Sequence, residues 1–199
     1  MYKRQALEGS IFIAGAGVQW LRDKIRLIDN AYETEKIAKS KKNSKGVYVV
    51  PAFTGLGAPY WNSKSRGLIT GLTRDSDWRD LVRATIESVA YQTSDLFLSM
   101  RKDGLNPKSV KVDGGMVSNN WFVQFLSEIL KIKITRSKIN ETTALGAAYM
   151  AGYQTGIYRS LSDIKQNWKK DRDFKPKFNK SYRNKLLQGW QQAIKKTLA

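Results

Sequence analysis

Short apolar runs alternate with longer amphipathic ones along this chain, and glycines lie at several of the junctions between the two kinds of run. In the segment VDGGMVSNN, an alternating apolar run ends at Asp113 and a run with helical spacing begins near Asn119. Apolar residues two apart are typical of a strand, and those three to four apart are typical of a helix. Repetition of strand, turn and helix predicts an α/β domain, in which helices flank a sheet.

The same patterns predict where the individual elements lie. Strands are expected at 11–13, 47–50, 109–113 and from 132, and helices at 18–28, 78–100, 122–130, 142–152 and 182–194. The polar segment 33–45 is expected to be a surface loop or a short exposed helix, and the glycine- and aromatic-rich segment 51–71 a long structured loop. Small side chains in 142–152 suggest that this helix lets a neighbouring backbone approach closely.

Composition excludes several kinds of chemistry. The chain has no cysteine and no histidine, which rules out disulfides, thiolate nucleophiles, typical zinc sites and Ser-His-Asp hydrolysis. Its 199 residues suffice for one domain with a hydrophobic core. No apolar stretch is long enough to cross a bilayer and no secretory cleavage pattern is evident, so a cytoplasmic protein without membrane contact is expected.

The net charge of +18 raises the question of nucleic-acid binding. Half of the excess lies in residues 159–199, where twelve basic residues face three acidic ones. That segment contains no zinc knuckle, RRM motif or basic zipper. A solvated basic surface is therefore favoured, and a nucleic-acid-binding tail is the alternative.

Two glycine turns are the candidate binding features. Gly114 and Gly115 can bring bare backbone against a ligand, and a helix that starts near Asn119 offers free N–H groups. The Asn119 amide could pair with a base edge, but the same pattern also fits an ordinary turn with an asparagine cap. The earlier turn, AGAGVQW, has Gly15 and Gly17 but lacks the third glycine of a dinucleotide fingerprint, so a helix start is favoured there.

No residue is predicted to be catalytic or to bind a metal. The carboxylate pairs Asp75 with Asp77 and Asp171 with Asp173 lie in polar stretches, where helix caps and solvated surfaces are the usual roles. Glu87 lies beside the apolar face of the 78–100 helix, which favours hydrogen-bonded structure over acid-base catalysis. No phosphate loop of the GxxxxGK[ST] type occurs.

Five segments, in this order and spacing, resemble successive blocks of the FGGY family of carbohydrate kinases, with the glycerol kinases as the nearest branch. They are ALEGSIFIAGAGVQWLRD, GVYVVPAFTGLGAPYWNSKSRGLITGLTR, LVRATIESVAYQTSDL, VDGGMVSNN and ETTALGAAYMAG. The resemblance runs from residue 6 to 156 and continues more weakly to the terminal helix.

The resemblance implies a ribonuclease-H-like domain of the actin and hexokinase type, with a mixed sheet flanked by helices. In that family two such domains enclose the active site, and this chain resembles only the later part of the second. The sheet is therefore expected to be incomplete at its N-terminal edge. The expected organisation is a partial C-terminal kinase domain over 1–158, with a basic extension over 159–199 whose terminal helix packs on the same domain.

The resemblance also implies a function. An intact relative would transfer the γ-phosphoryl group of ATP, with Mg²⁺, to glycerol and form sn-glycerol 3-phosphate. This chain would supply the adenosine side of the ATP or ADP site, through Gly15 and Gln19 in the first turn and Gly115 and Asn119 in the second.

The catalytic base, the glycerol contacts and the phosphate loops of the family fall in segments that precede this sequence. The chain alone is thus expected to be inactive, and its expected protein partners are the missing N-terminal half or another copy of itself. A noncatalytic interaction module with a basic tail is the alternative.

Overall fold

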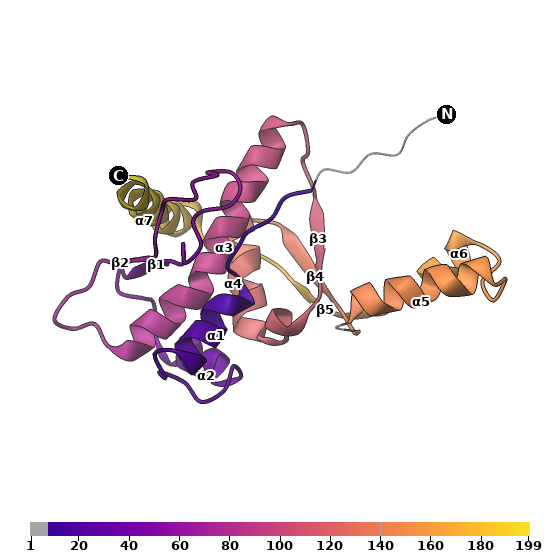
Figure 1. The fold of residues 1–199 in the computed structure, drawn as a ribbon, viewed down its shortest axis with the longest axis horizontal. Helices are drawn as coiled ribbons and strands as arrows, with labels where there is room; N and C mark the ends of the chain where they lie inside the picture. The colour runs from indigo at the N-terminus through magenta and orange to yellow at the C-terminus, as the bar shows by residue number, and fades with distance from the viewer. Residues whose placement is uncertain (1–7, 140) are drawn as a thin grey trace.

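The fold is seen in a computed structural model, which describes residues 8–139 and 141–199. It consists of a helical body with a small mixed sheet along one side, and an arm that stands away from the body (Figure 1). The arm is formed by α5 (Thr142–Gln154) and α6 (Leu161–Gln166). None of the described helices is long and apolar enough to cross a membrane.

Helix α3 (Trp78–Lys102) is the centre of the body. Its first turn is fixed by a capping box. The Asp77 carboxylate accepts the backbone N–H of Arg79, and the Asp80 carboxylate accepts the backbone N–H of Asp77. The helix packs against α1 (Gly15–Asp23), α2 (Glu33–Ser40), α4 (Asn120–Leu130) and β1 (Tyr48–Val50). A helix with neighbours on so many sides buries polar as well as apolar residues, and α3 does so over most of 80–95.

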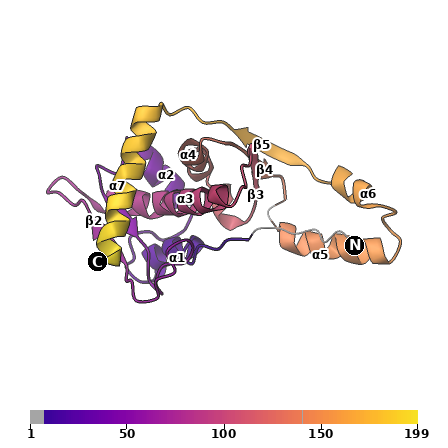
Figure 2. The same ribbon diagram turned by 90° about the horizontal axis from the view of Figure 1, so that it is seen from above.

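The main sheet has three strands in the order β3 (Ser109–Val112), β4 (Lys133–Ser137) and β5 (Lys170–Phe174). β3 runs parallel to β4, and β5 runs antiparallel to it, so the sheet is mixed. Helices α3 and α4 lie on one side of this sheet and the arm extends on the other (Figure 2). Among the described residues, β3 has no strand on its outer edge.

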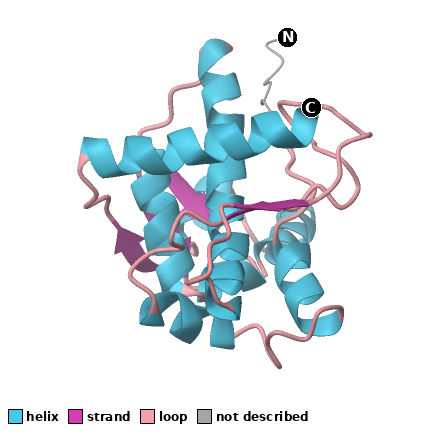
Figure 3. Ribbon diagram, turned by 90° about the vertical axis from the view of Figure 1, so that its left-hand side faces the viewer, coloured by secondary structure: helices cyan, strands magenta, loops and turns pink. Residues whose placement is uncertain are grey.

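A second strand pair and the last helix complete the body. β1 pairs antiparallel with β2 (Leu68–Thr70), and α7 (Lys180–Leu198) packs against both strands. Figure 3 shows α7 crossing over α3. Trp190 of α7 is fully buried, and its ring stacks on that of Tyr91 at a centroid distance of 5.4 Å. The chain after residue 158 thus contributes a strand to the main sheet and a large side chain to the core.

Most of the predicted elements are confirmed. The strands at 47–50 and 109–113, the strand from 132 and the helices at 78–100, 122–130 and 182–194 all occur, with ends shifted by a few residues. The mixed sheet flanked by helices also agrees with the expected fold class.

Three predictions near the N-terminus and in the long loop are wrong. Residues 11–13 are not a strand, and the following helix ends at Asp23 rather than near residue 28. The apolar triplet has no paired strand beside it; Ile13 is buried while Phe12 lies at the surface. Segment 51–71 is not only loop, because it contains β2. The first residues of the ALEGSIFIAGAGVQWLRD block, together with the predicted start of the domain, lie outside the described residues.

The predictions for α2 and α5 need correction as well. α2 is not simply exposed, because Thr34, Ile37 and Ala38 are buried. α5 has no close neighbour over most of its length: Gly152 is its only buried residue, and a Cβ built on Gly146 would meet no atom within 4 Å among the described residues. Gly152, close to the Tyr158 ring, is thus the one small residue of this helix with a packing role among the described residues, and the alanines are exposed.

Candidate functional site

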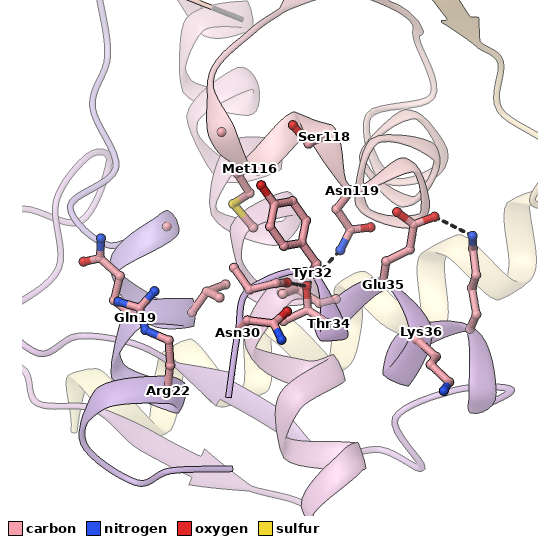
Figure 4. Close-up of a pocket in the computed structure, with 16 residues that line it drawn as sticks. Gln19, Arg22, Asn30, Tyr32, Thr34, Glu35, Lys36, Met116, Ser118 and Asn119 are labelled. Carbon is pink, nitrogen blue, oxygen red and sulfur yellow. Dashed lines mark hydrogen bonds and ion pairs between the residues drawn. The ribbon is translucent and has the colours of Figure 1, made fainter. Parts of the chain in front are cut away.

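A cavity of about 820 Å³ opens between α1, α2 and the turn that precedes α4. Ile86 of α3 also lines it, and Asn30 and Tyr32 border it (Figure 4). Val18, Ile86 and Met116 give it apolar surface, while its other sides carry amides, hydroxyls and charged groups. A few placed polar groups around an apolar interior are typical of a small-molecule site.

The first wall of the cavity is α1. This helix begins at Gly15, and no side chain caps its first turn. The N–H groups at a helix start attract anions, and the absence of a side chain at Gly15 leaves them accessible. Gln19 and Arg22 follow one and two turns later on the same face, as Figure 4 shows. Gly17 faces the other way, with Thr85 of α3 close against it, so it has a packing role.

The second wall is the turn that follows β3. Gly114 has a φ of +90°, a left-handed conformation that favours glycine. The chain then forms a short 3-10 helix, η1 (Gly115–Ser118), and enters α4. A Cβ built on Gly115 would meet nothing within 4 Å, so its backbone faces open space.

Asn119 combines two roles that the sequence left open. Its Oδ1 accepts a hydrogen bond from the backbone N–H of Phe122 at 2.9 Å and so caps α4. Its Nδ2 donates to Thr34 Oγ1 at 3.1 Å, which joins α4 to α2 (Figure 4). The side chain also lines the cavity, and one lone pair and one amide hydrogen remain for a ligand.

All four predicted site residues line this one cavity. Gly15 and Gln19 lie on the α1 wall, and Gly115 and Asn119 lie on the opposite one. The structure therefore brings together two turns that are far apart in the sequence.

The third side of the cavity, which is formed by α2 and the residues just before it, contains none of the predicted site residues. Its lining residues are Asn30, Ala31, Tyr32, Thr34, Glu35, Lys36 and Lys39. Tyr32 is 84% exposed although it borders a cavity, an unusual position for a large aromatic residue. The available signal was the spacing of Thr34, Ile37 and Ala38, which places one face of α2 against the body.

The cavity rim carries several cationic side chains and one carboxylate that forms an ion pair. Arg22, Lys36 and Lys39 line it, and Glu35 forms an ion pair with Lys39. Burial alone would raise the pKa of Glu35, but hydrogen bonds from Lys39 and Asn120 outweigh it and hold the pKa below its ordinary value. Glu35 is thus a fixed anion and not a proton acceptor near neutral pH.

The other carboxylates have structural roles, as predicted. Glu87 is buried and accepts hydrogen bonds from Arg83, Ser44 and Tyr91; its burial raises its pKa. Asp77 caps α3, and its bond with Arg79 lowers its pKa. Within the described residues there is no group of His, Cys, Asp or Glu side chains that could hold a metal ion.

Comparison with known proteins places this geometry in a family. Residues 2–155 match the model of the FGGY family of carbohydrate kinases, C-terminal domain. Glycerol kinase 1 of Pseudomonas aeruginosa is 54% identical over 191 residues, which cover 96% of this chain and 39% of that protein. Glycerol kinase of Alkaliphilus oremlandii is 50% identical over 194 residues, which cover 97% of this chain and 38% of that protein.

Solved structures give the same result. The crystal structure of Plasmodium falciparum glycerol kinase with ADP superposes with a TM-score of 0.87 at 40% identity, over 96% of this chain and 38% of that one. A xylulose kinase from Lactobacillus acidophilus is 22% identical and shares the fold, with a TM-score of 0.78 over 94% of this chain and 38% of that one.

The mixed sheet with its helices and the cavity between two glycine turns define the chain as a sugar-kinase domain of the actin and hexokinase type. The chain belongs to the FGGY family of carbohydrate kinases, and the matched residues are that family's C-terminal domain. It spans about 39% of the length of the curated glycerol kinases it matches. These comparisons do not favour the alternative of a noncatalytic interaction module.

Proposed function

We propose that this chain forms the adenosine-binding part of an ATP-dependent glycerol kinase. The observation that carries the proposal is the meeting of Gly15 and Gln19 with Gly115 and Asn119 across one cavity. The similarity to glycerol kinases, one of them solved with ADP, supports this assignment of ligand and substrate.

In the proposed complex the cavity holds the nucleoside, and the two glycine turns contact its base and ribose. The ring of the base lies against Val18, Ile86 and Met116, which offer apolar surface. The uncapped start of α1 and the bare backbone of Gly115 offer N–H groups to acceptor atoms of the nucleoside. Gln19 contributes amide hydrogen bonds to the nucleoside.

Phosphoryl transfer depends on positioning and on stabilising charge in an in-line transition state. The described residues supply one wall of such a site but no base placed beside a phosphate. We therefore assign the general base, the glycerol contacts and the groups that hold Mg²⁺ to none of the described residues, among which no cluster of side chains could hold a metal ion. The chain alone binds nucleotide and does not phosphorylate glycerol.

Calorimetric titration of the folded chain with ADP tests the binding half of the proposal. Gln19→Ala should weaken binding about tenfold, which corresponds to the loss of a hydrogen bond or two. Gln192→Ala is the matched control, because Gln192 is an exposed amide on α7 away from the cavity, and it should leave the affinity unchanged. Equal effects of the two substitutions would contradict the proposed site.

Complementation tests the catalytic half. The chain is mixed with the preceding N-terminal part of the Pseudomonas aeruginosa relative, and glycerol-dependent release of ADP from ATP is measured. The mixture should be active, whereas each part alone should not. A folded mixture that neither binds ADP nor phosphorylates glycerol would overturn the proposal.

A further inference from the structure

Arg136 of β4 forms hydrogen bonds to the second wall of the cavity, the turn that follows β3, without lining the cavity itself. Its Nη1 donates to the backbone carbonyl of Val117 at 2.7 Å, and its Nη2 donates to Asn120 Oδ1 at 3.0 Å. Val117 lies within η1 and Asn120 is the first residue of α4. One guanidinium is therefore bonded to the wall on both sides of Asn119, at Val117 and at Asn120.

The Arg136 side chain is itself held in place. Its Nε donates to Asp171 Oδ2 of β5 at 2.7 Å, and its guanidinium lies over the Phe174 ring at 5.5 Å. The side chain is only 13% exposed. A planar guanidinium with three directed bonds has little freedom, so it transmits the position of the sheet to the wall.

Glu35, which lines the cavity, also forms hydrogen bonds to this wall. Its Oε2 accepts the backbone N–H of Asn120 at 3.1 Å, and its Oε1 accepts Asn120 Nδ2 at 3.4 Å. The backbone N–H and the side-chain amide of Asn120 are thereby directed to these partners: N–H and amide nitrogen to Glu35, amide oxygen to Arg136. The wall is fixed between α2 and β4.

Arg136 does not line the cavity, whereas Glu35 does. Any effect of Arg136 on a ligand must therefore pass through Val117, Ser118 or Asn120, whose groups accept its hydrogen bonds, or through its charge. A displacement of about 1 Å in a binding group can cost up to about a hundredfold in activity, so such a support is consequential.

We propose that Arg136, together with Glu35, is a positioning residue of the nucleotide site: it sets the place of Gly115 and Asn119 without touching the nucleotide. This inference rests on the proposed function for its ligand, and it adds to that function a residue outside the cavity.

The test compares Arg136→Gln with Arg74→Gln, which removes the same charge at an exposed residue remote from the cavity. ADP and adenosine are titrated into each variant. Arg136→Gln should weaken both ligands by a similar factor of about ten, because the whole wall shifts. Arg74→Gln should change neither.

Two further variants separate positioning from charge and from general stability. Arg136→Lys keeps the charge but cannot form the fork, so it should also weaken both ligands. Asp171→Asn removes the charge of Arg136's own partner but keeps an oxygen that can accept its Nε–H, and it leaves Val117 and Asn120 unaltered, so it should have a much smaller effect. A loss confined to ADP, restored by Arg136→Lys, would overturn positioning in favour of an effect of charge on the phosphates.

Amide hydrogen exchange gives a readout that needs no ligand. In Arg136→Gln, the amides of Asn120 and Phe122 should exchange about tenfold faster than in the parent, while amides of α7 keep their rates. Unchanged exchange at Asn120 would overturn the positioning role. If the parent chain binds neither ligand, the proposed function fails, and the exchange rates still decide whether Arg136 holds the wall.

Discussion

Gly189 lies where α7 passes Tyr48 of β1, and its missing side chain is a packing requirement. A Cβ built there would come within 2.6 Å of the Tyr48 ring. The Tyr48 hydroxyl donates to the carbonyl of Leu186 at 3.1 Å, so the Tyr48 side chain is bonded to α7 itself. An alanine in a helix gains about 1 kcal/mol over glycine, whereas overpacking costs about 1–3 kcal/mol and a lost hydrogen bond about 1.

Gly189→Ala should therefore lower the free energy of unfolding by about 2 kcal/mol, because the clash outweighs helix propensity. Urea denaturation measures the change. Gly146→Ala in α5 is the matched control: the built Cβ meets nothing there, and helix propensity should raise stability by about 0.5–1 kcal/mol. Stabilisation by both substitutions would contradict the packing argument at Gly189.

The lowered pKa of Glu35 predicts that this residue makes a pH-dependent contribution to the free energy of unfolding. Because Lys39 and Asn120 hold its pKa below the ordinary value of 4.5, its contribution is complete above that value and is lost as the pH falls through the lowered pKa. Glu35→Gln should destabilise the chain at neutral pH, and the difference from the parent should shrink toward zero in acid. Urea midpoints at several pH values check this, with Asp75→Asn as the charge-matched control. A difference that persists unchanged in acid would contradict it.

At the residue level, the sequence predicted the two glycine turns but not what surrounds them. Spacing alone left each turn open to an ordinary structural role, and only the family resemblance paired them across one site. Arg136 and Glu35 could not be found in this way, because their partners at Asn120 lie 16 and 85 residues away. Such contacts follow from the fold and leave no periodic pattern.

Among the elements, most of those with a clear internal pattern were predicted, whereas the segment at 11–13 was predicted wrongly and β2 was missed. α3 carries its own capping box and a long apolar face. The apolar triplet at 11–13 satisfies a strand pattern but has no neighbouring strand, while β2 lies hidden among glycines and aromatic residues and forms by pairing with β1. Strand pairing is a property of two segments, so one segment's pattern does not determine it.

Asp95 joins three elements of the body. Its carboxylate accepts hydrogen bonds from Trp190 Nε1 at 2.6 Å, Gln191 Nε2 at 2.7 Å and the Tyr60 hydroxyl at 2.8 Å. Burial raises its pKa, and these three donors oppose that shift. The group thus ties α3 to α7 and to the loop before β2.

Asp95→Ala should lower the free energy of unfolding by about 3 kcal/mol or more, since it leaves buried donors without an acceptor. Tyr60→Phe removes one donor and leaves the others paired, so it should cost only about 1 kcal/mol. Urea denaturation followed by tryptophan fluorescence measures both. Equal costs would show that Asp95 acts through Tyr60 alone rather than as a junction of three elements.

The molecule as a whole is a body with a projecting arm, and its chain leaves the body and returns. The arm exposes Met150, Tyr153, Ile157 and Leu161. Beyond it, β5 pairs with β4, and α7 packs against β1 and α4. The expected boundary at 158/159 therefore falls within the arm, between two stretches that both contribute to the body.

Limited trypsin digestion tests whether the two stretches form one folding unit. Exposed basic residues in the arm, such as Arg159 and Lys165, should be cut before those of α3, because the arm has few buried contacts. The nicked chain should still elute as one species in gel filtration, since β5 and Trp190 anchor the C-terminal piece in the sheet and the core. The pieces should separate only in denaturant. Release of the C-terminal piece under native conditions would instead show that residues 159–199 are an appendage, and the stability assigned here to Gly189 and Asp95 would then have to come from contacts within the first stretch alone.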